Sequence, residues 1–129
     1  LVTEGHEKIL FVDDEPALVL SSWLKFLEES YKVAASTDSR AALELFMEQP
    51  ASFDLVITDQ TMPHMTGEML AREVLKVRAE VPIILCSGNC PSDRPGLSIE
   101  KSRAIGIKAF MTKPYERSEM SQVIRRVLD

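Results

Sequence analysis

Five short apolar runs, separated by stretches of helical periodicity, constrain the fold of this chain more than any other feature of its sequence. Each run is about five residues long, which is short for a helix, and most are rich in Val, Ile and Leu. Such runs are typical of strands that are covered on both faces. The predicted strands comprise residues 8–12, 31–35, 55–59, 82–86 and 107–111.

The segments between these runs carry apolar residues at helical spacing. Pro16 lies just inside the start of the first helix, where its missing N–H has no partner to lose. Residues 37–39 offer N-cap oxygens to the second helix. The predicted helices run from about 16 to 30, from 39 to shortly before 50, from 67 to 77, from 98 to 106, and from about 115 onward.

Strands and helices that alternate in this way predict a parallel sheet with helices on both faces, because right-handed crossovers place them there. We therefore predict a three-layer α/β/α domain with five strands in the order 2-1-3-4-5, the flavodoxin-like arrangement. The 129 residues suffice for a single domain, 1–129, with its core at about 8–128. The chain begins without Met, so we expect it to be a piece of a longer polypeptide.

Charge and hydropathy exclude two classes of partner. The net charge is −5, and the 15 basic residues are interleaved with 20 acidic ones, so no basic block offers a surface to nucleic acid or anionic lipid. No apolar run approaches the roughly 20 residues of a membrane span, and residues 1–6 do not resemble a signal peptide. We therefore expect a cytoplasmic chain that contacts neither nucleic acid nor membrane directly.

Four residues that can bind metals or form disulfides are interpreted as ordinary side chains. Cys86 and Cys90 form a pair of thiols without clustered histidines, which makes a poor zinc site, and cytosolic disulfides are rare. His6 and His64 are isolated in the sequence. We expect reduced thiols and solvated or locally bonded histidines at these positions.

Three aspartates are predicted to meet at one edge of the sheet. Asp13 and Asp14 follow the first strand, and Asp59 ends the third. In the predicted order these two strands are neighbours, and open α/β sheets bind ligands beyond the carboxyl ends of their strands. Converging carboxylates, with Glu15 nearby, repel one another and must either be protonated or hold a cation.

A ligand set made only of oxygen suits a hard divalent cation. Mg²⁺ takes one or two protein carboxylates and keeps several waters, so the cluster can bind it and leave room for a phosphoryl oxygen. The alternative is that Asp13 or Asp14 merely caps the first helix, which requires one side chain and not three.

Two further polar residues are predicted at the same edge. Ser87 follows the fourth predicted strand and can donate its hydroxyl to a phosphoryl oxygen, and Lys113 follows the fifth and offers an ammonium charge. Each is weak evidence alone, because such serines are often turn residues and most lysines are solvated. Together with the acidic pair and the strand-end Asp59, in this order along the chain, they are much stronger evidence for a site at this edge.

On these residues the sequence resembles the receiver domain of two-component response regulators, from about 8 to 128. The resemblance implies that Asp59 accepts a phosphoryl group from a histidine kinase or a histidine phosphotransfer domain, with Mg²⁺ as cofactor. It also implies that Asp14, Asp59 and the backbone carbonyl of Thr61 ligate Mg²⁺, while Asp13 acts largely through water. The residues that carry it are Val12-Asp13-Asp14-Glu15-Pro16, Asp59 with Met62-Pro63 and Gly67, Ser87, and Lys113-Pro114.

The resemblance implies how the chain signals and resets. The acyl phosphate is labile to water, so we expect a self-phosphorylating phosphoacceptor with slow autophosphatase activity rather than a conventional enzyme. In the family, the positions of Thr61 and Asn89 tune the phosphate lifetime. In the family, the residues at the positions of Ser87 and Phe110 change conformation on phosphorylation and so form the signalling switch. Phe110 can equally be a core residue. The fourth helix, fifth strand and fifth helix then form the surface that binds a downstream or tethered protein.

Two features depart from the family pattern. Residues 90–97 lengthen the loop after the fourth strand, which puts a standard fourth-helix surface in doubt. The 129 residues contain no effector domain. Receivers of this kind occur alone and as tethered receivers of hybrid histidine kinases, and resemblance in residues 58–63 and 101–106 favours the hybrid kinase.

Three rival functions make different demands on the sequence. A flavodoxin-type cofactor binder needs a neutral phosphate loop after the first strand, where Asp13, Asp14 and Glu15 would repel phosphate. A haloacid-dehalogenase-like phosphatase is expected to place two aspartates there at alternate positions, and these are adjacent. The third rival is a pseudo-receiver, an interaction module that is never phosphorylated. It normally lacks an acidic residue or the lysine, and this chain has them all.

Overall fold

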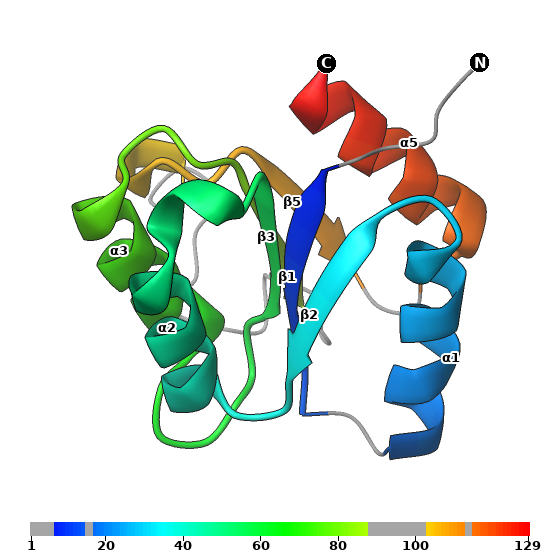
Figure 1. Ribbon diagram of the computed structural model, residues 1–129, viewed down its shortest axis with the longest axis horizontal. Coiled ribbons are helices and arrows are strands. Elements are labelled where there is room, and N and C mark those ends of the chain that lie inside the picture. The colour runs from blue at the N-terminus through cyan, green and yellow to red at the C-terminus, as the bar shows by residue number, and fades with distance from the viewer. Residues whose placement is uncertain (1–6, 15–16, 88–102, 113–114) are drawn as a thin grey trace.

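The structure, a computed structural model, describes residues 7–14, 17–87, 103–112 and 115–129, and it places their side chains except those of 17–20. Five parallel strands form one sheet in the order β2-β1-β3-β4-β5 (Figure 1). The predicted fold and strand order are confirmed. The strands are β1 (Lys8–Val12), β2 (Lys32–Ser36), β3 (Leu55–Asp59), β4 (Ile83–Ser87) and β5 (Ala109–Thr112). The helices are α1 (Ala17–Glu28), α2 (Ser39–Glu48), α3 (Gly67–Val77) and α5 (Arg117–Leu128), with a short 3-10 helix at Pro50–Ser52.

Pairing between strands, rather than the apolar runs alone, determines where the strands end. β1 and β3 have the predicted bounds. β2 and β4 lie one residue further along the chain than predicted, because Ser36 pairs with Val12 and Ser87 pairs with Thr112. β5 begins two residues later than predicted, at Ala109. Each of these two strands therefore ends with a polar serine, because a neighbouring strand pairs with it.

Helices α2 and α3 begin at side-chain caps. Asp38, one of the predicted N-cap residues, accepts a backbone hydrogen bond at the start of α2, and Thr66 accepts one from the N–H of Met69 at 3.2 Å. The bounds of α3 are those predicted. α5 begins at Arg117, so Tyr115 lies before the helix and not inside it as predicted.

The loop at 90–97 lies outside the described residues, as does most of the predicted fourth helix. Of that helix, residues 103–105 are described and are helical. Within the described part of the chain, no helix is both long and apolar enough to span a bilayer.

Successive residues along each strand alternate between two core clusters, one on each face of the sheet. Helices α1 and α5 cover one face, and α2 and α3 cover the other (Figure 1). In β1, Ile9 and Phe11 belong to the cluster beneath α1 and α5, and Leu10 and Val12 belong to the cluster beneath α2 and α3. This alternation decides which helices a residue at the end of a strand can reach.

Each helix contributes a narrow buried stripe to its cluster. Phe46 of α2 and Leu70 and Val74 of α3 are fully buried, whereas Met69 and Val77 of α3 are 49% and 41% exposed. The apolar residues of α3 therefore do not all face the core. Among the described side chains of α1 and α5, those buried in their cluster are Leu27, Met120, Val123 and Ile124.

Candidate functional site

The strand register brings Asp13 beside Asp59. Val12 of β1 pairs with Thr58 of β3, so the next residue of each strand is an aspartate at the same level of the sheet. The period-two alternation of the strands directs both carboxylates toward the face that α1 and α5 cover. Both residues are only 5% exposed. The site therefore follows from the pairing of two strands that are distant in the sequence.

Asp14 completes a cluster of three carboxylates. Asp13, Asp14 and Asp59 each offer one carboxylate oxygen, and these oxygens lie within 4.8 Å of one another. Asp14 is exposed, whereas the other two are buried. Like charges at this distance repel, and the repulsion is stronger where protein replaces screening water. The structure thus brings together the three aspartates that the sequence places at this edge.

The donor atoms of this cluster fit a small, hard divalent cation. All three donor atoms are carboxylate oxygens, the ligands that Mg²⁺ and Ca²⁺ prefer. Softer metals favour thiolate or imidazole ligands instead. Among the described residues, this is the one group of acidic, His or Cys side chains that converges closely enough to share an ion. A helix cap would need one carboxylate, so capping does not account for three.

The loop between β3 and α3 is tied back to the end of β3. The N–H of Gly67 donates to the carbonyl oxygen of Gln60 at 3.0 Å, and the N–H of Glu68 donates to Oε1 of the Gln60 side chain at 2.8 Å. Gln60 directly follows Asp59. These two hydrogen bonds therefore restrain the loop that carries Thr61 next to the carboxylate cluster.

Gly67 lies so close to the end of β3 that no side chain fits there. A Cβ atom at this position would lie 2.2 Å from the carbonyl oxygen of Asp59 and 2.8 Å from Cδ1 of Leu85. The first of these contacts is with backbone, which cannot rotate away. Glycine is needed here for a close approach of two backbone segments, one of which carries Asp59.

The other predicted site residues lie in different surroundings. Ser87 is the half-buried last residue of β4 rather than the first residue of a loop. Thr61 is exposed in the loop after β3. Phe110 of β5 is half-buried and packs against the cluster beneath α2 and α3. The predicted residues outside the described part of the chain are Glu15, Asn89 and Lys113.

The sequence predicts no functional role for the histidines and cysteines. Cys86 is a buried thiol in β4, and His64 is exposed in the loop after β3. His64 has a φ of 71°, in the left-handed region that non-glycine residues seldom occupy. The remaining two, His6 and Cys90, lie outside the described residues.

Sequence reasoning missed Tyr115, whose hydroxyl hydrogen-bonds to Cys86 beside the cluster. Burial raises the pKa of the Tyr115 phenol well above its ordinary value, and the charge and hydrogen bond of Cys86 and the charges of Asp13 and Asp59 raise it further. The phenol is therefore neutral at physiological pH. The sequence signal that could have indicated this contact is the alternation along β4. It places Cys86 on the same face as Ile84, which is the face against which Tyr115 packs.

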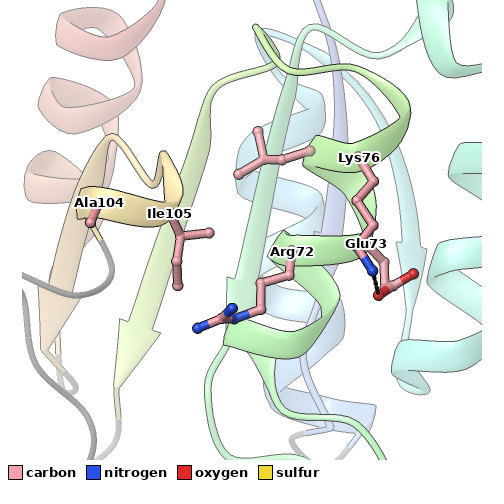
Figure 2. A pocket seen from close by; sticks show the side chains of 6 residues that line it. Arg72, Glu73, Lys76, Ala104 and Ile105 are labelled. Carbon is pink, nitrogen blue, oxygen red and sulfur yellow. Dashed lines mark hydrogen bonds and ion pairs between the residues drawn. The ribbon is translucent and has the colours of Figure 1, made fainter.

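A separate groove of about 640 Å³ lies between α3 and residues 103–105. Arg72 and Ile105 lie on opposite sides of it, and Lys76 forms a 2.9 Å ion pair with Glu73 at its rim (Figure 2). None of the residues that line this groove belongs to the carboxylate cluster. The groove is therefore not the site that holds the converging aspartates.

Comparison with known proteins identifies a single family. The sequence model described as "Response regulator receiver domain" matches residues 9–125. The chain is 32% identical over 124 residues to the chemotaxis protein CheY of Thermotoga maritima, covering 94% of this chain and 97% of that protein. It is 30% identical over 125 residues to the two-component response regulator ORR26 of Oryza sativa subsp. japonica, covering 93% of this chain but 20% of that protein.

A solved structure shares the fold. The response regulator receiver domain protein from Clostridium thermocellum superimposes with a TM-score of 0.84 at 28% identity, covering 95% of this chain and 94% of that chain. The match extends over nearly the whole sheet and its helices. The likeness in sequence therefore extends to the three-dimensional arrangement.

Proposed function

The chain belongs to the response regulator receiver family, and we propose that it is the phosphoacceptor of a two-component phosphorelay, with Asp59 as the residue that takes the phosphoryl group. One observation carries the assignment of Asp59. It ends a central strand and lies in a cluster with Asp13 and Asp14 whose oxygens are within 4.8 Å of one another. Family membership alone would not identify the residue.

The reaction requires little covalent chemistry from the protein. A carboxylate oxygen of Asp59 attacks the phosphorus of a phosphohistidine, an O–P bond forms, and the P–N bond breaks. The departing imidazole nitrogen keeps the electron pair and takes up a proton. Later, water attacks the phosphorus, the Asp59 O–P bond breaks, and inorganic phosphate leaves. Burial of Asp59 limits the access of this water and so sets the lifetime of the acyl phosphate. We propose that Thr61 and Asn89 adjust this lifetime further.

The cofactor we propose is Mg²⁺, which would neutralise charge on the phosphoryl oxygens. Asp14, Asp59 and the backbone carbonyl of Thr61 would hold it, with Asp13 acting largely through water. The buried position of Asp13 and Asp59 supports this proposal, because a cation is one of the two ways, besides protonation, to relieve the repulsion between buried carboxylates so close together. The hydrogen bonds of Gln60 keep the Thr61 loop near these aspartates.

Asp13→Asn and Asp14→Asn are each expected to weaken Mg²⁺ binding by roughly tenfold or more, because each removes one charge close to the ion. Asp13→Asn should also raise the melting temperature of the metal-free protein, since it relieves repulsion between two buried carboxylates. Calorimetric titration with Mg²⁺ and thermal unfolding with EDTA measure these effects. Asp54→Asn is the matched control, because Asp54 precedes β3 at the opposite end of the strand. Equal loss of affinity in all three variants would contradict the site.

Two further residues are proposed to stabilise the phosphoryl group. Ser87, at the end of β4, would donate its hydroxyl to a phosphoryl oxygen, and Lys113, which follows β5 in the sequence, would supply a positive charge. Both act on charge that is already present on the phosphoryl group. Substitution of Ser87 or Lys113 should therefore change the rate of phosphorylation and the signalling output more than the stability of the fold.

Lys113→Ala is expected to slow phosphorylation by roughly tenfold to a hundredfold, because the loss of one cation leaves the transferring phosphoryl group less neutralised. The rate constant of phosphorylation by acetyl phosphate, followed by intact mass, measures the effect. Lys108→Ala removes an exposed lysine from the opposite end of β5 and should leave the rate unchanged. If both variants react at the wild-type rate and signal normally, Lys113 has no role at the site.

The proposed partners follow from the chemistry and the family. The phosphoryl donor is a histidine kinase or a histidine phosphotransfer domain. The output is a downstream or tethered protein that binds the face formed by the predicted fourth helix, β5 and α5, and Ser87 and Phe110 would switch that face. We propose that the chain acts in the cytoplasm, in contact with neither nucleic acid nor membrane. The stand-alone and hybrid-kinase contexts place the same chemistry on Asp59.

Intact mass spectrometry after incubation with Mg²⁺ and acetyl phosphate tests the proposal. We expect one adduct of about 80 Da that is labile in base and absent in EDTA. The second candidate function, a pseudo-receiver that only binds other proteins, predicts no adduct. An unmodified chain that also fails to bind Mg²⁺ would favour that alternative over phosphorylation.

A further inference from the structure

Tyr115 lies between β5 and α5 and is fixed by its ring as well as by its hydroxyl. The half-buried ring packs against the cluster beneath α1 and α5, and its centroid lies 4.9 Å from that of Trp23 of α1. The two ring planes are tilted by 59°. Aromatic pairs at this distance hold each other in place beyond the effect of burial alone.

The hydroxyl of Tyr115 is directed toward the end of β4. The hydroxyl hydrogen-bonds to the side chain of Cys86. The negative charges of Asp13 and Asp59 also act on this hydroxyl. Tyr115 thus places a neutral hydroxyl, a group that can donate a hydrogen bond, near the carboxylate cluster.

Cys86 connects this donor to the backbone of the site. It pairs in register with Asp59 across β3 and β4, and its carbonyl oxygen accepts a 2.8 Å hydrogen bond from the N–H of Gln60. Ser87 is the next residue along β4. A shift of Cys86 would therefore move its paired residue Asp59, its hydrogen-bond partner Gln60 and its neighbour Ser87.

We propose that Tyr115 is a positioning residue of the phosphorylation site, which holds Cys86 so that the ends of β3 and β4 keep a fixed position relative to α1. The inference rests on the proposed function, because positioning has an effect only if Asp59 reacts. Tyr115 acts through Cys86 and makes no bond to the phosphoryl group. Its hydroxyl should therefore affect the rate of phosphorylation more than the affinity for Mg²⁺, because the three carboxylates that bind the ion all remain.

Tyr115→Phe tests the proposal, because it keeps the ring against Trp23 and removes only the hydroxyl. We expect the rate constant of phosphorylation, at saturating Mg²⁺ and acetyl phosphate, to fall about three- to tenfold, the range expected for one lost hydrogen bond. The dissociation constant for Mg²⁺ should change less than about twofold. A role in stability alone would lower the melting temperature and leave the rate per folded molecule unchanged.

Tyr31→Phe is the matched control. Tyr31 is the other tyrosine of the chain, it packs against the same cluster, and its hydroxyl accepts a 3.4 Å hydrogen bond from Nη1 of Arg125, away from the carboxylates. The substitution removes the same hydroxyl from a second half-buried tyrosine that packs against this cluster. We expect the rate constant of Tyr31→Phe to equal that of the wild-type chain.

A double-mutant cycle with Cys86→Ala separates action through Cys86 from any other action of the hydroxyl. If the hydroxyl acts through Sγ, adding Tyr115→Phe to Cys86→Ala should slow the reaction no further. If the loss of rate in the double variant equals the product of the losses in the two single variants, the proposal is overturned. A wild-type rate in Tyr115→Phe would also overturn it while leaving the proposed function intact. Absence of an adduct in the wild-type chain would instead overturn the proposed function, and this inference with it.

Discussion

Asp59→Asn is expected to abolish the mass gain that Mg²⁺ and acetyl phosphate produce in the wild-type chain. The amide has no negative oxygen with which to attack phosphorus, and the cluster loses one of its charges. Removal of a nucleophile typically lowers a rate by at least roughly a thousandfold. Asparagine has nearly the shape of aspartate, so β3 should keep its pairing and the protein should stay folded. Intact mass followed over time, with circular dichroism as a check on folding, measures the result.

Asp38→Asn is the matched control for this prediction. Asp38 caps α2, and asparagine is about as good an N-cap as aspartate, so the substitution exchanges the same atoms at a site unrelated to the cluster. Its phosphorylation rate and stability should match those of the wild-type chain. If Asp59→Asn gained phosphate as fast as Asp38→Asn, the phosphoryl group would have to be carried elsewhere on the chain.

Gly67→Ala is expected to have the second largest effect, because it acts on both the fold and the site. Its Cβ would lie 2.2 Å from the carbonyl oxygen of Asp59, so the start of α3 and the end of β3 must separate. Overpacking of this kind lowers the free energy of unfolding by about 3 kcal/mol. A displacement of Asp59 by about 1 Å would slow phosphorylation by roughly a hundredfold. Urea unfolding measures the first effect, and the adduct rate at a temperature where the variant is folded measures the second.

Gly106→Ala separates loss of stability from loss of geometry. Gly106 has a φ of 123°, so alanine is strained there, and its Cβ would meet only the side chain of Leu75, which is part of α3. We expect a loss of stability of about 1 kcal/mol or more and an unchanged rate per folded molecule. A wild-type rate in Gly67→Ala would contradict the view that this close approach positions Asp59.

The order and type of the strands could be predicted because hydropathy and chain order carry that information. Fully apolar runs such as residues 55–59 indicate strands covered on both faces, and alternation with helices leaves few possible topologies. The exact bounds could not be predicted in the same way. Ser36 and Ser87 extend their strands because a neighbouring strand pairs with them, and such pairing is not visible in local sequence.

The three aspartates could be placed together from sequence because parallel strands end at the same edge. Asp13, Asp14 and Asp59 each follow or end an apolar run, so the strand order alone brings them close. Tyr115 could not be placed, because the sequence predicts it to begin the last helix, which in the structure begins at Arg117. Its contact with Cys86 depends on how the segment before α5 packs against α1.

The hydrogen bonds that restrain the loop between β3 and α3 could not be predicted from the sequence either. The side chain of Gln60 accepts a hydrogen bond from the N–H of Glu68, and its carbonyl oxygen accepts one from the N–H of Gly67. A glutamine in a loop is usually solvated, and no spacing rule predicts this partner. Such contacts become visible only when the backbone path between β3 and α3 is known.

The measurement that tests the central claim most directly is the location of the phosphoryl group on the chain. Borohydride reduces an acyl phosphate at the carbonyl carbon and leaves an alcohol in place of the carboxyl group, so peptide mapping after phosphorylation and reduction identifies the modified position. We predict reduction at position 59, only in samples that contain both Mg²⁺ and acetyl phosphate. Reduction at Asp13, at Asp14 or at any other carboxylate, with Asp59 intact, would contradict the account.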